Sequence, residues 1–124
     1  MQTLSHASTV TMPGYVILTH DHPFLHWDLM LQQGDSLRTW RLLEEPVPGH
    51  TIRAESLPDH RIAWLDFEGP VSGNRGTVRR WDSGAHEILG ESDDFLRVKL
   101  SGRVLSGVAV VQVNPADGHW EFRI

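Results

Sequence analysis

Short apolar runs, separated by glycine, proline, asparagine and aspartate, are the feature that most limits how this chain can fold. Most runs are about 5–9 residues long, alternate apolar with polar side chains and show no helical period. We expect strands at residues 15–20, 25–32, 37–43, 62–67, 77–81, 85–89, 95–100, 104–113 and 119–124, with one helical turn near residues 53–57. Many short strands joined by turns predict an all-β barrel or sandwich.

The predicted domain organisation is simple. Residues 1–13 have no clear period and are expected to form a flexible N-terminal arm, whereas residues 14–124 are expected to form a single β domain. The 124-residue chain has no cysteine, which excludes disulfides, thiolate metal sites and cysteine nucleophiles. No apolar run approaches the ~20 residues of a membrane span, and the N-terminus lacks the pattern of a secretory signal. We therefore expect a cytoplasmic protein without a membrane segment.

Potential metal ligands concentrate in residues 20–32, HDHPFLHWDLMLQ. Side chains alternate along a strand with a period of two, so His26 and Asp28 share one face. The preceding strand ends at His20, on the other arm of a predicted hairpin. Two histidines and one carboxylate commonly leave metal positions open for water or substrate. The alternative is a solvated strand face whose polar residues bond one another; we favour a metal site because three ligands gather around one hairpin.

Other polar residues carry weaker signals. His22 lies in the predicted turn and is a reserve ligand. An isolated histidine is usually structural, but His60 heads a predicted strand from which it would contact a phosphate or donate a proton to a leaving group. The loop of residues 73–76 lacks the lysine and helix of a P-loop, so we expect it to serve turn geometry and close backbone approach. Four histidines are expected to be surface residues: His6, His50, His86 and His119.

An ordered set of motifs runs from residue 15 to residue 124. It begins with His20 and a six-residue step to His26-Trp27-Asp28-Leu29-x-Leu31. The later motifs are Leu37-x-x-Trp40, His60-x-x-x-Trp64-x-Asp66-Phe67-Glu68-Gly69, Gly73-Asn74-x-Gly76-Thr77-Val78-x-x-Trp81-Asp82-x-Gly84, Leu100-x-Gly102, Leu105-x-Gly107 and Trp120-x-Phe122. Together they resemble the 3′-phosphoesterase domain of bacterial DNA ligase D, and the ordered set is more specific than any one motif.

The resemblance implies a small closed β-barrel of about eight mostly antiparallel strands, with at most short helical turns and a crescent-shaped active site. It also implies a manganese ion, with zinc as the alternative, bound by His20, His26 and Asp28. These residues and His60 would form the catalytic site, with His60 contacting the substrate phosphate opposite the metal. The implied activity is DNA-repair trimming of nucleic-acid 3′ ends, DNA or RNA, by removal of a terminal ribonucleoside and then the 3′-phosphate. A separately encoded ligase or polymerase would be a partner.

The chain departs from this family at residues near the substrate. Met30 stands where the family has an arginine that helps hold the phosphate, and methionine cannot replace its charged, bidentate hydrogen bonds. Gln32 replaces a glutamate, Leu18 a glutamine and Trp64 a tyrosine. Residues 1–14 also show no match to the acidic, arginine-bearing arm of the family. The chain thus keeps the metal ligands and loses much of the substrate shell.

Three interpretations follow. The first is a metal-dependent phosphoesterase in which Arg38, Arg79 or Arg80 supplies the missing charge; Arg79 and Arg80, with Arg75, form the densest basic cluster, for which a solvated strand edge is the default. The second is a non-catalytic relative that keeps the metal site as a binding module. The net charge of −5 favours it, because such a chain is poorly suited to broad contact with a nucleic-acid backbone. The third is a barrel that binds a small molecule and whose histidines are incidental.

Overall fold

The computed structural model describes residues 12–124, and this part of the chain is all-β. The strands are β1 (Gly14–His20), β2 (His26–Gln33), β3 (Ser36–Leu42), β4 (Ile52–Arg61), β5 (Gly69–Pro70), β6 (Thr77–Ser92), β7 (Phe95–Gly102), β8 (Ser106–Val113) and β9 (Trp120–Arg123). One 3-10 helix, η1 (Ile62–Leu65), follows β4. Residues 1–11, most of the predicted arm, lie outside the described part. Within residues 12–124, no helix is long and apolar enough to cross a membrane.

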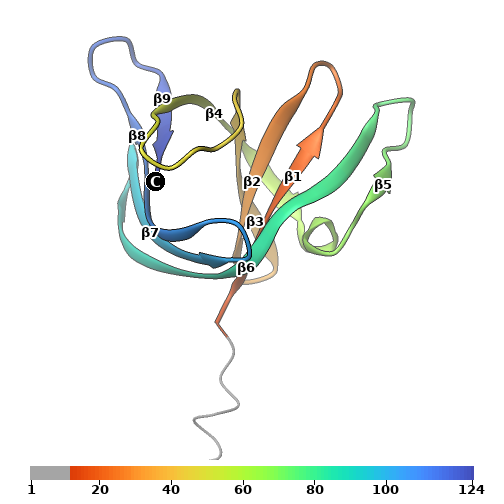
Figure 1. The fold of residues 1–124 in the computed structure, drawn as a ribbon, viewed down its shortest axis with the longest axis horizontal. Helices are drawn as coiled ribbons and strands as arrows, with labels where there is room; N and C mark the ends of the chain where they lie inside the picture. The colour runs from red at the N-terminus through yellow and green to blue at the C-terminus, as the bar shows by residue number, and fades with distance from the viewer. Residues whose placement is uncertain (1–11) are drawn as a thin grey trace, which may run out of the picture.

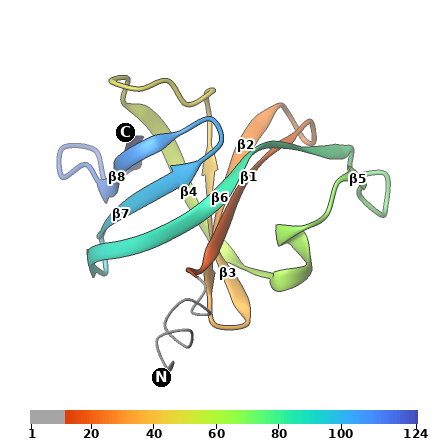
Figure 2. The same ribbon diagram turned by 60° about the horizontal axis from the view of Figure 1, so that its bottom comes forward.

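The sheet closes on itself to form a barrel (Figure 1). Its strand order is β1-β2-β3-β4-β9-β8-β7-β6, and β6 returns to pair with β1. All pairs are antiparallel. The two-residue β5 pairs with β6 outside this ring, and Figure 2 shows β5 beyond β1 and β6. The predicted closed barrel of eight antiparallel strands is therefore confirmed, and closure removes the free edges of these strands.

Two predicted elements near the middle of the chain are wrong. Residues 53–57, expected to form a helical turn, lie inside β4, where Ile52 and Ala54 alternate into the barrel. Residues 62–67, expected to form a strand, begin with η1. The turn is stabilised by the backbone N–H of Asp66, which donates to the Ala63 carbonyl oxygen. Pairing with β3 and β9 determines where the strand lies, and local composition does not reveal that pairing.

A third correction concerns β6, which is one strand of 16 residues instead of two strands separated by a turn at residues 82–84. The buried carboxylate of Asp82 accepts a hydrogen bond from the Tyr15 hydroxyl group. A side chain at Gly84 would overlap the backbone of β7, so glycine lets β6 and β7 approach closely. Aspartate and glycine, which signal a turn in the sequence, here form a corner of the barrel.

The barrel wall carries buried apolar side chains on both faces. The interior cluster comprises Tyr15, Ile17, Leu29, Leu31, Trp40, Leu42, Ile52, Ala54, Leu96, Val98, Leu100, Leu105, Ala109, Val111 and Phe122. A second group, which we call the outer cluster, comprises Val16, Leu18, Met30, Leu37, Val71 and Val78, with Trp64 and Leu65 packed against it. The segment of η1 and β5 lies over this group, on the outside of the barrel (Figures 1 and 2).

Because of the outer cluster, both faces of β2 are buried, although its alternating sequence pattern suggests one buried and one solvated face. Leu29 and Leu31 point into the barrel, as alternation predicts, but the opposite face of β2 is buried too. His26 is 0% and Asp28 4% exposed, so the alternative of a solvated strand face does not hold for them. Buried polar side chains of this kind need partners that compensate for lost hydration.

Candidate metal centre

The hairpin of β1 and β2 brings the three predicted ligands together. His20 is the last residue of β1 and lies directly opposite His26, the first residue of β2. Asp28 is two residues further along β2 and therefore points to the same face as His26. The two imidazole rings meet edge to face, with their centres 5.0 Å apart. Local strand alternation and hairpin register are enough to assemble this group.

The distances within the group are short. His26 Nε2 lies 3.2 Å, and His20 Nδ1 3.7 Å, from the same oxygen of Asp28, Oδ2. One potential ligand atom from each residue lies within 4.8 Å of the others. The His20 side chain keeps 17% of its surface exposed, so the group is open to solvent on the β1 side.

Backbone carbonyl groups hold both histidines in defined orientations. His26 Nδ1 donates to the Phe24 carbonyl oxygen at 2.8 Å, and His20 Nε2 donates to the Arg75 carbonyl oxygen at 2.7 Å. A carbonyl oxygen only accepts, so these nitrogens carry the hydrogens, and in neutral rings the other nitrogens present lone pairs. Both lone pairs face the Asp28 carboxylate. A cation between the three groups would stabilise this arrangement, as in metal sites whose histidines are oriented by a second partner.

The donor set fits a divalent first-row metal ion. Two imidazole nitrogens and a carboxylate oxygen suit manganese, iron or zinc, and three protein ligands leave positions for water or substrate. Asp28 Oδ1 is buried and has no hydrogen-bond partner among residues 12–124. A bound metal ion would compensate for the buried negative charge of the Asp28 carboxylate, which is delocalised over Oδ1 and Oδ2. His20, His26 and Asp28 are thus a group that could hold a metal ion.

The glycine loop fixes the position of His20. Gly76 adopts a positive φ of 77°, and a side chain there would overlap the Asp21 carboxylate. Asp21 accepts a hydrogen bond of 2.8 Å from the Thr77 backbone N–H, which lowers the pKa of Asp21 below its usual value. These contacts hold the loop against the hairpin, so that the Arg75 carbonyl reaches His20. Turn geometry and close backbone approach, expected from the sequence, are what the loop provides.

His22 and His60 lie outside the three-residue group. The ring centre of His22 is 6.3 Å from that of His20. His60 donates from Nδ1 to the Pro58 carbonyl oxygen at 3.0 Å, and its ring packs edge-on against Trp64, with centres 6.3 Å apart. Trp64 in turn packs on the outer cluster. Across the described residues no hydrogen bond or ion pair joins His60 to the metal group, and its contact with a phosphate stays a prediction.

A cavity of about 340 Å³ lies beside Trp64 on the outside of the barrel. It is lined by Arg61, Ala63, Trp64, Phe67, Pro70, Val71, Ser72 and Arg75. Arg75 connects it to the metal group, because its carbonyl oxygen holds His20. Aromatic rings beside guanidinium groups are suited to stacked bases and backbone phosphates of a single strand.

Burial and hydrogen bonding explain what three residues that depart from the family do. Met30 is 1% exposed within the outer cluster, where a charged side chain would lack water. The Gln32 side chain accepts a hydrogen bond of 3.0 Å from the Gly14 backbone N–H. Leu18 belongs to the same cluster as Met30. These positions therefore serve packing and strand attachment in this chain.

The three arginines considered as replacements are placed differently from one another. Arg38 lies opposite Leu31, an interior residue, and its guanidinium carbon is 4.5 Å from the Trp40 ring centre. Arg79 lies opposite Thr19, and its side chain therefore points to the face of the sheet opposite that of His20. Arg80 lies opposite Leu18, on the outer face, and its backbone N–H donates to the Glu68 carboxylate at 2.8 Å.

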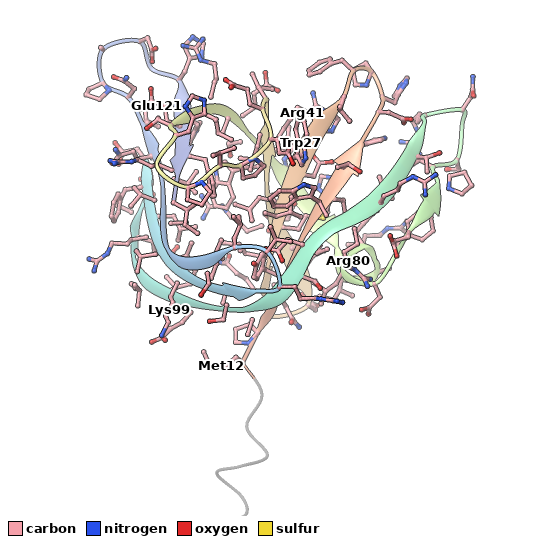
Figure 3. The ribbon with its side chains drawn as sticks, viewed as in Figure 1. Met12, Trp27, Arg41, Arg80, Lys99 and Glu121 are labelled. Atoms are coloured by element: carbon pink, nitrogen blue, oxygen red, sulfur yellow. The ribbon has the colours of Figure 1, made fainter. Side chains whose placement is uncertain are left out.

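Sequence reasoning missed a fourth arginine, Arg41, which lies directly opposite Asp28 on the neighbouring strand β3. The two-residue turn at Gly34 and Asp35 carried the signal, because it fixes the register of β2 and β3. In Figure 3, Arg41 is labelled beside β2. One side-chain nitrogen of Arg41, Nε, is buried and has no hydrogen-bond partner in the described part of the chain.

The expectation that four histidines are surface residues is wrong for His86. It is 2% exposed and bonds through Nε2 to the Gln32 carbonyl oxygen at 2.9 Å. Burial lowers the pKa of His86. His50 and His119 are exposed as expected, whereas His6 lies outside the described residues.

Comparison with known proteins agrees with this architecture. Residues 18–113, more than half of the chain, match the DNA Ligase D 3′-phosphoesterase domain family. The chain is also 30% identical over 103 residues to the multifunctional non-homologous end joining protein LigD of Pseudomonas aeruginosa. That match covers 75% of this chain and 12% of the longer relative. The protein described here therefore belongs to the DNA ligase D 3′-phosphoesterase domain family.

Proposed function

We propose that this protein is a metal-dependent phosphoesterase that removes a 3′-phosphate or a 3′-terminal ribonucleoside from nucleic-acid ends. Family membership supports phosphoesterase-type chemistry. The observation that carries the proposal for this chain is the orientation of His20 and His26, whose free ring nitrogens both face the Asp28 carboxylate. The proposal assigns these three residues to a manganese ion, with zinc as the alternative.

The proposed site divides the chemistry between two groups of side chains. A divalent ion, when bound, supplies Lewis-acid polarisation of a phosphoryl oxygen and lowers the pKa of a coordinated water. The Phe24 and Arg75 carbonyl groups keep the histidines in the tautomers that such an ion needs. His60 donates from Nδ1 to the backbone, so Nε2 is the ring nitrogen left for a phosphate oxygen or a leaving group.

The cavity beside Trp64 is the proposed place for the nucleotides next to the reacting phosphate. It lies between η1 and the glycine loop and carries the Arg61 and Arg75 side chains together with Phe67. A single-stranded end fits this surface better than a long duplex, because the net charge of −5 does not favour extended backbone contact. A ligase or polymerase that uses the trimmed end, and a cytoplasmic location, complete the proposal.

A non-catalytic metal-binding module is the second candidate, favoured by the packing roles of Met30 and Gln32. An end-processing assay separates the two. Metal-loaded protein is incubated with a DNA strand ending in a 3′-phosphate and with a primer ending in one ribonucleotide, and products are resolved by electrophoresis. We expect manganese-dependent release of phosphate or ribonucleoside by the wild type and none by His26→Ala. Absence of turnover at saturating manganese, zinc and iron, despite measured metal binding, would favour the module.

A further inference from the structure

Asp28 and a phosphoester carry negative charges that a single divalent ion does not balance. A phosphate monoester dianion and one carboxylate bring three negative charges, against the two positive charges of the ion. A second cation beside the site would offset the excess, and charge-assisted bonds from arginine are the strongest that a side chain offers to phosphate. Met30, buried in the outer cluster, provides none.

The register of the barrel places Arg41 next to Asp28. The two residues are direct cross-strand partners in the β2–β3 pair. On β3, Trp40 and Leu42 point into the barrel, so Arg41 points outward, as Asp28 does. Directly opposed residues on one face have Cβ atoms about 4.5–5.5 Å apart, a spacing that lets long side chains meet over one site.

The guanidinium group of Arg41 makes few strong polar contacts with other side chains of the described residues. Its contact with the half-exposed Glu55 carboxylate is 3.5 Å long, and Nε is buried without an acceptor among the described residues. The guanidinium carbon lies 5.6 Å from the centre of the Phe24 ring. Phe24 also holds His26 through its carbonyl oxygen, so one residue positions both a metal ligand and this cation. A buried donor without a partner is costly unless a ligand satisfies it.

We propose that Arg41 binds the phosphate of the substrate, donating from Nε and a terminal nitrogen to two non-bridging oxygens. This inference rests on the proposed function, because it assumes a phosphate at the metal group. The side chains of Arg38 and Arg79 point to the barrel interior, away from the face that carries Asp28. Arg80 lies on the same face and in the same cross-strand row as Asp28, but Leu18 stands between them, whereas Arg41 is a direct neighbour of Asp28. Arg41 thus supplies from β3 a charge that β2 does not carry in this chain.

The test measures binding of inorganic phosphate to the manganese-loaded protein by isothermal titration calorimetry. Arg41→Gln and Arg41→Lys are compared with Arg38→Gln, a matched control that removes one charge from the opposite face of the same strand. We expect Arg41→Gln to weaken phosphate binding about 10–100-fold, the loss typical of one charged hydrogen-bonding partner. Arg41→Lys should recover part of the affinity, because it restores charge without the bidentate geometry. Manganese affinity should change less than about two-fold in all three variants, since none is a ligand.

Two results would overturn the inference. One is wild-type phosphate affinity in Arg41→Gln and Arg41→Lys proteins that bind manganese normally; the other is a wild type that binds manganese but no phosphate. Because the readout is binding, it stays informative if the end-processing assay shows no turnover. In that case a lost phosphate affinity in Arg41→Gln would support Arg41 as an anion-binding residue of a non-catalytic module, and the hydrolytic proposal alone would fail.

Discussion

Replacing Asp28 by asparagine should have opposite effects on the metal-free and metal-loaded protein. In the metal-free protein with both imidazole rings neutral, the carboxylate faces two lone pairs. The asparagine amide nitrogen can replace Oδ2, which lies 3.2 Å from His26 Nε2, and donate to that ring nitrogen. One new hydrogen bond contributes about 1 kcal/mol, and removal of a poorly solvated charge adds to it. We expect the metal-free variant to be about 1–2 kcal/mol more stable than wild type.

The metal-loaded protein should behave in the reverse way. A ligand present at 100 times its Kd stabilises the folded state by about 2.7 kcal/mol, and Asp28→Asn should lose most of this gain because a neutral amide is a poor ligand for these ions. Thermal unfolding with and without manganese measures both effects, and about 1 kcal/mol corresponds to a Tm shift of about 4–8 °C in a domain of this size. Asp93→Asn, at an exposed turn residue, is the control. A variant that is less stable without metal, yet keeps the wild-type response to manganese, would refute the lone-pair argument.

Two further predictions concern the glycine loop beside the site and the buried histidine of β6. Gly76→Ala should lower manganese affinity about 10-fold, since its side chain would displace the Asp21 carboxylate and with it the loop that orients His20; unchanged affinity in titrations monitored by calorimetry would contradict this role of the loop. Burial lowers the pKa of His86, so the folded state resists protonation there and the stability of the protein should fall as pH drops below about 6.5. Urea unfolding between about pH 8 and pH 5 should show a shallower decline for a folded His86→Gln variant than for wild type, and equal slopes would argue against this cause.

The sequence predicted the metal group because its geometry is local. Strand alternation places His26 and Asp28 on one face, and a single short turn returns the chain from His20 to His26. No contact between distant segments is needed to bring these residues together. The short strands predicted a barrel or a sandwich, and the resemblance to a known family narrowed this to a closed barrel.

What the sequence did not show depends on contacts between distant segments. Residues 82–84 read as a turn because the partners that make them a barrel corner, Tyr15 and the backbone of β7, lie far away in the chain. His86 appeared to be a surface residue because its burial depends on β1, β2 and the segment before them. Arg41 needed both the β2–β3 register and the knowledge that Trp40 points inward.

The outer cluster under η1 means that each strand of the β1–β3 wall has two independent sets of residues. The inward set determines the volume and shape of the barrel, whereas the outward set carries the candidate metal ligands, Met30 and Arg41. Substitutions on the outward set therefore change charge and chemistry without repacking the interior. On such a wall, a cation can be lost from one strand and supplied by its neighbour without any change in the barrel interior. Substrate preference can therefore diverge among proteins that share the fold.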